Sequence, residues 1–295
     1  MYYKESTLVY LDGQWLHPKS LDCSLYSQTL HYGIGVFEGI RAYKTPRGAK
    51  IYRGRAHYQR LLDSCAKMHI KLDYTVDQLM DLTHELLRKN GLEDAYIRPL
   101  VYQGDSMALA PIEETHLFIA TWEWGRYLGD SLLKVKTSSY QRPNPKSTHI
   151  EAKTCGHYVN SLLATREAKS QGFNEALLTD LNGHVAEGSS ANFFFEKDGV
   201  LYTPPLGHIL PGITRQAILD LAEANGIKVE QKFFTLDEVK QADSAFFTGT
   251  AAEVAGAESL DDYRFPLPWK DSLGHRLSEL YTEDVRRPET VEATS

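Results

Sequence analysis

The sequence predicts an α+β protein of two domains, each a mixed β-sheet with helices on its faces. Its 295 residues exceed the length that one hydrophobic core usually serves. In both halves, apolar strand candidates with hairpin turns occur beside amphipathic stretches of helical spacing. We expect a smaller N-terminal domain over residues 1–124, a connection over 125–131 and a larger C-terminal domain over 132–295.

The first half is expected to contain two hairpins, two helices and two long strands. Asp12-Gly13 is a hairpin turn between apolar runs, and Pro46-Arg47-Gly48 is a second turn. Apolar residues recur at helical spacing from Leu61 to Met68, and Gly91 is a helix stop. The predicted elements are a hairpin over 8–16, a strand over 38–43 with its hairpin partner at 50–52, helices over 55–68 and 76–89, and strands over 95–102 and 116–124.

The second half is expected to combine a meander of strands with three helices. Asn182-Gly183 and Asp198-Gly199 are the strongest short-range hairpin signals in the chain. The predicted elements are a strand over 133–138, a polar loop over 141–149, a helix over 158–171, strands over 175–179, 184–186, 192–196 and 200–203, a helix over 214–225, a strand over 228–234, a helix over 236–241 and a strand over 244–248.

Composition excludes several classes of function. The net charge of −7 argues against a nucleic-acid surface, which needs clustered Lys and Arg. No apolar run approaches the roughly 20 residues of a bilayer-spanning helix, and the N-terminus lacks the apolar core of a signal peptide. Cys23, Cys65 and Cys155 are widely spaced and show no metal-ligand pattern. We expect a reduced cytoplasmic enzyme with no metal, no nucleic-acid partner and no membrane contact.

Lys153 is the strongest candidate catalytic residue. It ends the polar loop just before a predicted helix, and Glu187 follows on a turn of small residues beginning at Gly188. A lysine paired with a distant carboxylate indicates a pyridoxal phosphate site. The amine would form a Schiff base with the cofactor aldehyde, and the carboxylate would keep the pyridine nitrogen protonated. Without Lys153, Glu187 could equally be a turn glutamate that faces water.

A phosphate-bearing cofactor also needs an anion site, and two turns could supply one. Residues 210–215 form a Pro-Gly turn that leads into a helix, whose first N–H groups and dipole attract anions. Residues 248–253 form a Gly-Thr turn at a strand end. Arg55 adds a cation at a helix start, and Tyr158 lies five residues beyond Lys153. Taken singly, these could be a good helix start, a surface arginine and a packing aromatic.

A possible substrate site lies in the first half. Tyr96 and Arg98 alternate on a strand and therefore point to one face. An arginine beside Tyr96 and Tyr32, with Phe37 nearby, could bind a substrate carboxylate by charge-assisted hydrogen bonds. An interfacial arginine among packed aromatics is an equal interpretation.

Together these segments resemble the class IV aminotransferases, which are fold-type IV pyridoxal phosphate enzymes, and among them most of all the branched-chain amino acid aminotransferases. The similar segments run in the family's order from about residue 11 to 258. They are 30–41, 52–61, 95–100, 124–129, 152–158, 186–188, 210–215 and 249–253. So many motifs in order are specific, whereas residues 260–295 carry little family signal.

The resemblance implies a homodimer, or an assembly of dimers, with the cofactor at the interface of the two domains. Lys153 would hold the cofactor and shuttle a proton, Glu187 would pair with the pyridine nitrogen, and Tyr158 would bind the 3′-oxygen. The phosphate would be held by Arg55 and by the two turns, through Gly212, Ile213, Thr214, Gly249 and Thr250.

The resemblance also implies a substrate pocket for small amino and 2-oxo acids. The α-carboxylate would be bound by Tyr96, Thr250 and Ala251, and the side-chain carboxylate of glutamate by Arg98 with Tyr32 and Tyr127. The apolar walls would be Phe37, Gly39, Trp124 and the loop carrying Met107 and Leu109, that loop coming from the neighbouring subunit. One pocket would thus admit Leu, Ile or Val in one half-reaction and glutamate in the other.

Two departures from the branched-chain pattern leave alternatives open. Glu187 is followed by a Ser-rich turn, Ser189-Ser190-Ala191, and the loop over 106–111 is a residue short. The turn is closer to that of D-amino acid aminotransferases and of the lyases of this fold. Among the lyases, aminodeoxychorismate lyase, which uses the same lysine but releases pyruvate, is an alternative, and R-amine transaminases share the fold as well. Leu100 stands where D-specific enzymes typically have a histidine, so the branched-chain interpretation is favoured. A non-catalytic binding protein is disfavoured because Lys153 and Glu187 are both present.

Overall fold

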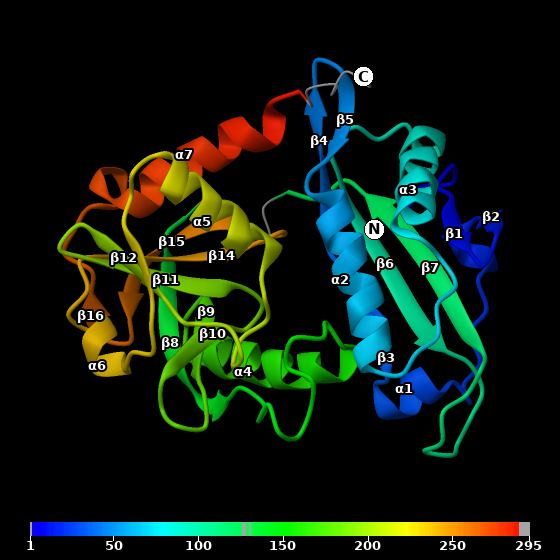
Figure 1. Cartoon of the computed structure of the whole chain (residues 1–295), viewed down its shortest axis with the longest axis horizontal. Helices are drawn as coiled ribbons and strands as arrows, with labels where there is room; N and C mark the ends of the chain where they lie inside the picture. The colour runs from blue at the N-terminus through cyan, green and yellow to red at the C-terminus, as the bar shows by residue number, and fades with distance from the viewer. Residues whose placement is uncertain (1, 126–127, 130, 289–295) are drawn as a thin grey trace. The chain divides into compact units, whose positions relative to one another are not determined.

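The computed structural model describes residues 2–125, 128–129 and 131–288. The chain divides into two units, one of Met1–Trp124 with the C-terminal residues from Thr282, the other of Gly125–Tyr281 (Figure 1). The sequence analysis placed all residues after 131 in the second domain. The end of helix α7 (Leu273–Arg286) instead packs with the first unit, because the Tyr52 hydroxyl donates to Asp284 Oδ2 at 2.8 Å.

The first unit is a seven-stranded sheet with two helices on one face. The strands lie in the order β2-β1-β7-β6-β4-β5, with β3 also paired to β6, and every pairing among these described strands is antiparallel. The elements are β1 (Val9–Leu11), β2 (Gln14–Leu16), η1 (Pro18–Ser20), α1 (Gln28–Tyr32), β3 (Gly35–Phe37), β4 (Ile40–Thr45), β5 (Gly48–Ile51), α2 (Gly54–Lys67), α3 (Val76–Asn90), β6 (Ala95–Gln103) and β7 (Thr115–Trp122).

Helices α2 and α3 confirm the predicted helices over 55–68 and 76–89. Helix α3 begins with a capping box in which Thr75 and Gln78 satisfy each other's backbone N–H groups, and it ends at Gly91 in the left-handed conformation (φ 62°). The apolar faces of both helices bury Leu61, Leu79 and other leucines against the sheet. The short helix α1 was not predicted, because five residues are too few to show an apolar period.

The second unit is a nine-stranded mixed sheet, and its α+β character is as predicted. The strands lie in the order β10-β9-β8-β15-β14-β11-β12-β13, with β16 paired to β15. The elements are β8 (Leu133–Gln141), η2 (Cys155–His157), α4 (Tyr158–Ser170), β9 (Glu175–Thr179), β10 (Val185–Gly188), β11 (Asn192–Lys197), β12 (Val200–Thr203), α5 (Ile213–Ala224), β13 (Val229–Gln231), α6 (Leu236–Val239), β14 (Ser244–Gly249), β15 (Glu253–Leu260), β16 (Tyr263–Arg264), η3 (Trp269–Asp271) and α7.

Strand β15 lies near the middle of this sheet, yet the sequence analysis did not predict it. It pairs in parallel with β8 and antiparallel with β14. Four of its eight residues are Gly, Ala or Ser, which have poor β-propensity. A Cβ on Gly256 would lie 2.7 Å from the Trp269 ring, so the strand needs a glycine at this position. Buried packing, rather than local propensity, makes this segment a strand.

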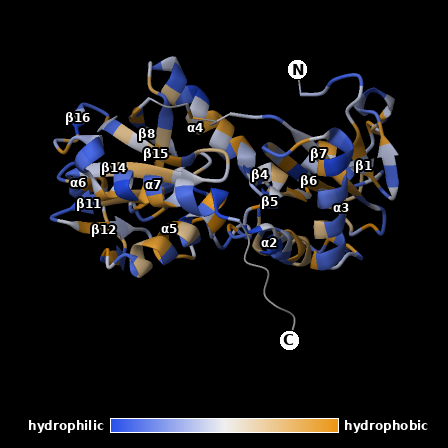
Figure 2. Ribbon diagram, turned by 90° about the horizontal axis from the view of Figure 1, so that it is seen from above, coloured by the Kyte–Doolittle hydropathy of each residue, from blue (hydrophilic) through white to orange (hydrophobic). Residues whose placement is uncertain are grey.

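Side chains pack on both faces of this sheet, because successive residues of β9 contact different apolar clusters. Leu177 packs in the cluster that includes Phe193 and Val239 of α6, whereas Ala176 and Leu178 pack against Ala164 and Ala168 of α4. In the ribbon coloured by hydropathy, orange gathers on strands in the middle of the unit, beside the β14 label, and the helices carry both colours (Figure 2). The rigid sheet therefore fixes the loops at its strand ends, including those around Lys153 and Glu187.

Candidate active site

Lys153 and Tyr158 are brought together by the short helix η2. This turn of 3-10 helix separates Lys153 from α4 and lets the Lys153 ammonium donate to the Tyr158 hydroxyl at 2.5 Å. His157 fastens the preceding loop, because its Nε2 lies 2.6 Å from Thr148 Oγ1. Burial, and then the charge of Arg142, lowers the pKa of His157, which favours the neutral ring. The lysine is thus presented from an anchored loop.

Glu187 is buried on β10 and does not face water. Its carboxylate accepts from Asn192 Nδ2 at 3.0 Å and from the Leu210 N–H at 3.3 Å, and only 5% of the residue is exposed. Burial raises the pKa of the Glu187 carboxyl, although Arg142, the Leu210 N–H and Lys153 each act to lower it. Lys153 is thus one of the charges that act on the Glu187 carboxyl, and both residues belong to the second unit.

Arg142 is a site residue that the sequence analysis missed. It is buried, its Nε lies 2.9 Å from Glu187 Oε1 in an ion pair, and its Nη1 donates to Asn160 Oδ1 at 3.2 Å. In the sequence it is one arginine in a polar loop, which local pattern does not separate from a surface residue. Only the fold brings the start of that loop to β10.

The two predicted anion-binding turns have the features that such sites need. Gly212 is the N-cap of α5 and no side chain caps the helix, so its first N–H groups are available to an anion. A Cβ on Gly212 would lie 1.8 Å from Asn192 Oδ1, and therefore only glycine fits there. Gly249 ends β14, and a Cβ there would lie 3.4 Å from the Ser190 carbonyl oxygen, so the turn that begins there lies against the Ser-rich turn.

In the first unit, the predicted substrate residues around Arg98 form one cluster. The Arg98 guanidinium lies 4.7 Å from the Phe37 ring centre and donates to the Tyr96 hydroxyl at 3.3 Å. A Cβ on Gly39 would lie 1.9 Å from the Tyr96 hydroxyl oxygen, and the Trp124 ring stands edge-on to Tyr96 at 4.8 Å. A cavity of about 440 Å³ is lined by Arg98 and Trp124 together with residues that were not predicted for the site, among them Tyr2, Tyr3, Phe118 and Trp122. The structure thus places two predicted residues, Phe37 and Tyr96, against the Arg98 cation and two more, Gly39 and Trp124, against Tyr96.

Tyr32, Met107 and Leu109 form a second, exposed group in the first unit. The Tyr32 hydroxyl donates to the Met107 carbonyl oxygen at 3.0 Å, and the exposed fractions of Tyr32, Met107 and Leu109 are 45%, 53% and 85%. Tyr127, the remaining predicted substrate residue, lies outside the described residues. Arg55 is also exposed, and its guanidinium pairs with Asp77 at 2.6 Å.

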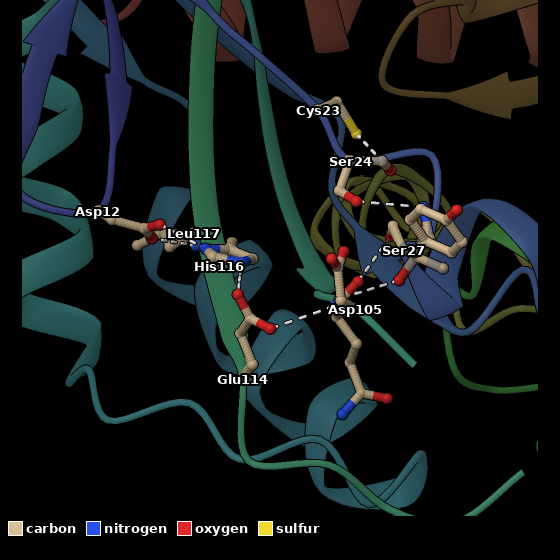
Figure 3. Close-up of polar contacts among 11 residues, drawn as sticks. Asp12, Cys23, Ser24, Ser27, Asp105, Glu114, His116 and Leu117 are labelled. Carbon is tan, nitrogen blue, oxygen red and sulfur yellow. Dashed lines mark hydrogen bonds and ion pairs between the residues drawn. The ribbon is translucent and has the colours of Figure 1, made fainter. Parts of the chain in front are cut away.

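The base of the loop that carries Met107 is held by a chain of polar contacts (Figure 3). The Asp105 N–H donates to Glu114 Oε2 at 3.2 Å, and Glu114 Oε1 lies 3.2 Å from His116 Nε2. His116 Nδ1 lies 2.6 Å from Asp12 Oδ2 on the β1–β2 turn. This chain connects the irregular loop to the edge of the sheet.

Two features are absent from the described part of the chain. No helix there has the length and apolar character needed to cross a membrane. Nor do its His, Cys, Asp and Glu side chains form a group of three placed to hold a metal ion.

Comparison with known proteins gives one consistent family. A family model described as amino-transferase class IV matches residues 35–260. A branched-chain-amino-acid aminotransferase of Pseudomonas aeruginosa is 43% identical over 284 residues, covering 94% of this chain and 92% of that protein.

Solved structures that resemble this chain are also branched-chain amino acid aminotransferases. The Escherichia coli branched-chain amino acid aminotransferase has a TM-score of 0.93 at 34% identity, with 98% of each chain covered. The branched-chain amino acid aminotransferase of Thermobaculum terrenum, solved in its PLP-form, has a TM-score of 0.88 at 30% identity, with 95% of this chain and 94% of that chain covered. With most of its length matched by the family model and by these relatives, the chain belongs to the class IV aminotransferases.

Proposed function

We propose that this chain catalyses pyridoxal phosphate-dependent transamination between L-leucine, L-isoleucine or L-valine and 2-oxoglutarate, giving branched-chain 2-oxo acids and L-glutamate. The observation that carries the proposal is that the second unit holds both Lys153, hydrogen-bonded to Tyr158, and Glu187, a buried carboxylate whose pKa Lys153 acts to lower. Relatives that are named branched-chain-amino-acid aminotransferases over nearly the whole chain support this substrate class.

The residues present fit pyridoxal phosphate. Glu187 is a buried carboxylate, suited to a protonated ring nitrogen, and the uncapped start of α5 suits a phosphate. Thr154 Oγ1 and Thr248 Oγ1 are buried without a hydrogen-bond partner among the described residues, one beside Lys153 and one beside Gly249. Such unmet polar atoms are expected where a polar group binds.

The protein's own groups would move one proton and hold the charges around it. Bound pyridoxal phosphate supplies an aldehyde that condenses with amines and a ring that takes up the electrons of the broken Cα–H bond. The Lys153 amine would accept that proton from the substrate Cα and return it at the cofactor C4′. Glu187 would hold the ring nitrogen protonated, and Tyr158 would donate to the 3′-oxygen. Arg55, Ile213, Thr214 and Thr250, with the turn glycines Gly212 and Gly249, would bind the phosphate.

Substrate recognition is assigned to the aromatic cluster and to the Gly249 turn. Tyr96 with Thr250 and Ala251 would bind the α-carboxylate, and Arg98 with Tyr32 and Tyr127 the side-chain carboxylate of glutamate. Phe37, Gly39, Trp124, Met107 and Leu109 would form the apolar wall. An arginine stacked on aromatic rings suits this dual use, because it offers a charge to glutamate and a flat face to leucine.

We further propose a homodimer or an assembly of dimers in the cytoplasm, with the two domains joined over residues 125–131. A set of exposed apolar residues on and beside α1, here called the α1 patch, supports self-association: Leu25, Tyr26, Leu30, Tyr32, Met107 and Leu109. Cys23, Cys65 and Cys155 form no disulfide with one another, which suits a reducing compartment.

Replacing Lys153 tests the proposed chemistry. Lys153→Ala is expected to abolish turnover of L-leucine and the visible absorbance band of the bound cofactor, because the amine that would hold the cofactor is removed. The matched control is Lys146→Ala, an exposed lysine of the same loop, which should leave both unchanged. Normal turnover in Lys153→Ala would contradict the proposal.

A further inference from the structure

We infer that Gln28 is a positioning residue for substrate side-chain selection, acting through the loop over 105–111. The inference rests on the proposed function, in which Met107 and Leu109 of this loop wall the substrate pocket. Gln28 lies in α1 and is 4% exposed, although a glutamine on a five-residue helix would ordinarily face water. Its burial therefore needs a partner that satisfies the amide.

That partner is the loop backbone. Gln28 Nε2 donates to the carbonyl oxygens of Ala108 at 2.7 Å and of Ala110 at 3.1 Å. Because both partners are carbonyl acceptors, the nitrogen and not the oxygen of the amide must face them. The loop has no helix or strand of its own, so these bonds replace the ladder that a regular element would provide.

Helix α1 is itself hydrogen-bonded to the sheet, so its bonds to the loop restrict the motion of the loop relative to the sheet. The side chains on either side of Gln28 both bind Gln103 of β6. The Ser27 hydroxyl donates to the Gln103 carbonyl oxygen at 2.7 Å, and the Gln103 N–H donates to Thr29 Oγ1 at 2.8 Å. Three consecutive residues thus tie β6 to the loop.

Tyr32 completes the clamp from the same helix face. It lies four residues after Gln28, one turn along the helix, and its hydroxyl donates to the Met107 carbonyl oxygen at 3.0 Å. The carbonyls of Met107, Ala108 and Ala110 are therefore all held by α1, while the side chains of Met107 and Leu109 remain more than half exposed. The clamp fixes the backbone and leaves the apolar side chains available for contact.

This loop presents the apolar side chains of Met107 and Leu109 to the substrate. A less ordered loop should therefore raise the KM for L-leucine more than the KM for L-glutamate. Gln28→Met keeps the length of the side chain and removes its donors. Two lost hydrogen bonds predict a rise in KM for L-leucine of about tenfold. We expect kcat and the KM for L-glutamate to change by less than about threefold, and the visible cofactor band to stay. Gln28→Glu, which presents acceptors to two carbonyls, should have the larger effect.

A matched control and a substrate-free readout make the test decisive. Gln59→Met removes an exposed glutamine whose Nε2 donates to Asp63 on α2, and should leave all values unchanged. Hydrogen exchange at the amides of residues 105–110 should be faster in Gln28→Met than in the wild type, without any substrate present. Arg98→Ala should give the opposite kinetic pattern, with glutamate affected more than leucine.

The outcomes separate this inference from the proposed function. Unchanged exchange at 105–110, or equal rises in KM for leucine and glutamate, would overturn the positioning role. Wild-type enzyme that does not react with L-leucine would overturn the proposed function, whereas faster exchange in the variant would still support the clamp. Should Gln28→Met fail to fold, Tyr32→Phe removes a single clamp bond, and the same exchange measurement decides.

Discussion

Glu187 is subject to two opposing influences, and their balance decides its charge. Burial favours the neutral acid, whereas Arg142, the Leu210 N–H and Lys153 favour the carboxylate. Arg142 forms an ion pair with it at 2.9 Å. The arginine therefore helps to keep Glu187 ionised, which is the form that pairs with a protonated ring nitrogen.

Removing Arg142 should accordingly raise the pKa of Glu187 further. In Arg142→Met we expect cofactor affinity to increase with pH across the range in which the protein stays folded, since Glu187 then ionises only at higher pH than in the wild type. Breaking a buried pair should also lower the free energy of unfolding by about 3 kcal/mol. Titration of the apoenzyme with pyridoxal phosphate across this pH range measures the first effect. A profile like that of the wild type, or of the control Arg166→Met on α4, would contradict this role.

In the first unit, the pKa of Glu38 is shifted in the opposite direction to that of Glu187. It is fully buried, and its carboxylate lies 2.7 Å from His57 Nδ1 and 2.6 Å from Arg60 Nε. Burial acts to raise the pKa of Glu38, but the charges of Arg60 and His57 outweigh it and hold the pKa far below its usual range. A depressed folded-state pKa stabilises the protein above the unfolded pKa of about 4.3, and this stability is lost as pH falls toward the folded value.

Replacement of Glu38 should therefore flatten acid denaturation. Wild-type unfolding free energy should fall as pH drops from about 5 to 3, and Glu38→Gln should show a smaller fall from a value about 3 kcal/mol lower at pH 7. Denaturant titrations at several pH values measure both. The exposed residue Glu93, which pairs with Lys44, supplies the control Glu93→Gln. If the unfolding free energy of Glu38→Gln fell with pH as steeply as that of the wild type, the contacts of Glu38 with His57 and Arg60 would not be the source of the acid sensitivity.

At the scale of elements, local signals predicted those parts of the fold that local chemistry decides. Helix α3 has a capping box at Thr75 and a glycine stop at Gly91, and its bounds were predicted to within a residue. Strand β15 was missed because Gly256 and its small neighbours are strand residues only when Trp269 packs on them. Helix α7 was not predicted either, although its apolar residues recur at helical spacing from Leu273 to Val285.

The residues of the candidate site also fall into two groups, those that a local motif predicts and those that only the fold brings together. Lys153 and Tyr158 are five residues apart, so a short motif could predict both. Arg142 meets Glu187 from 45 residues away in the sequence, through the pairing of β8, β9 and β10, and Gln28 meets Ala108 from 80 residues away. Contacts at such separations depend on strand register, which no local pattern contains.

The loop base predicts a further effect at this scale. His116 links Asp12 to Glu114, which receives the Asp105 N–H (Figure 3). In His116→Ala, hydrogen exchange at Asp105 and Ser106 should accelerate, while the free energy of unfolding should change by less than about 1 kcal/mol because these groups are partly exposed. Exchange as slow as in the wild type would show that α1 alone holds the loop.

At the scale of the whole molecule, the α1 patch predicts which surface this chain uses to associate with a second copy of itself. Apolar residues exposed together on one surface indicate a contact with another chain, and the family resemblance implies a dimer. Leu30→Asp should shift the sedimenting mass from that of the proposed dimer or assembly of dimers toward that of the monomer, because a carboxylate would be buried without a partner. Leu206→Asp, at an exposed leucine outside the patch, is the control. An unchanged dimer in Leu30→Asp would place the interface elsewhere.

The half-reaction of the purified enzyme tests the central claim most directly. L-leucine should bleach the visible absorbance band of the bound cofactor, and 2-oxoglutarate should restore it, because the amino group passes to the cofactor and then to the oxo acid. D-alanine, R-1-phenylethylamine and aminodeoxychorismate serve as the comparison substrates. No response to L-leucine, with bleaching by D-alanine or the R-amine or with pyruvate release from aminodeoxychorismate, would contradict a branched-chain aminotransferase.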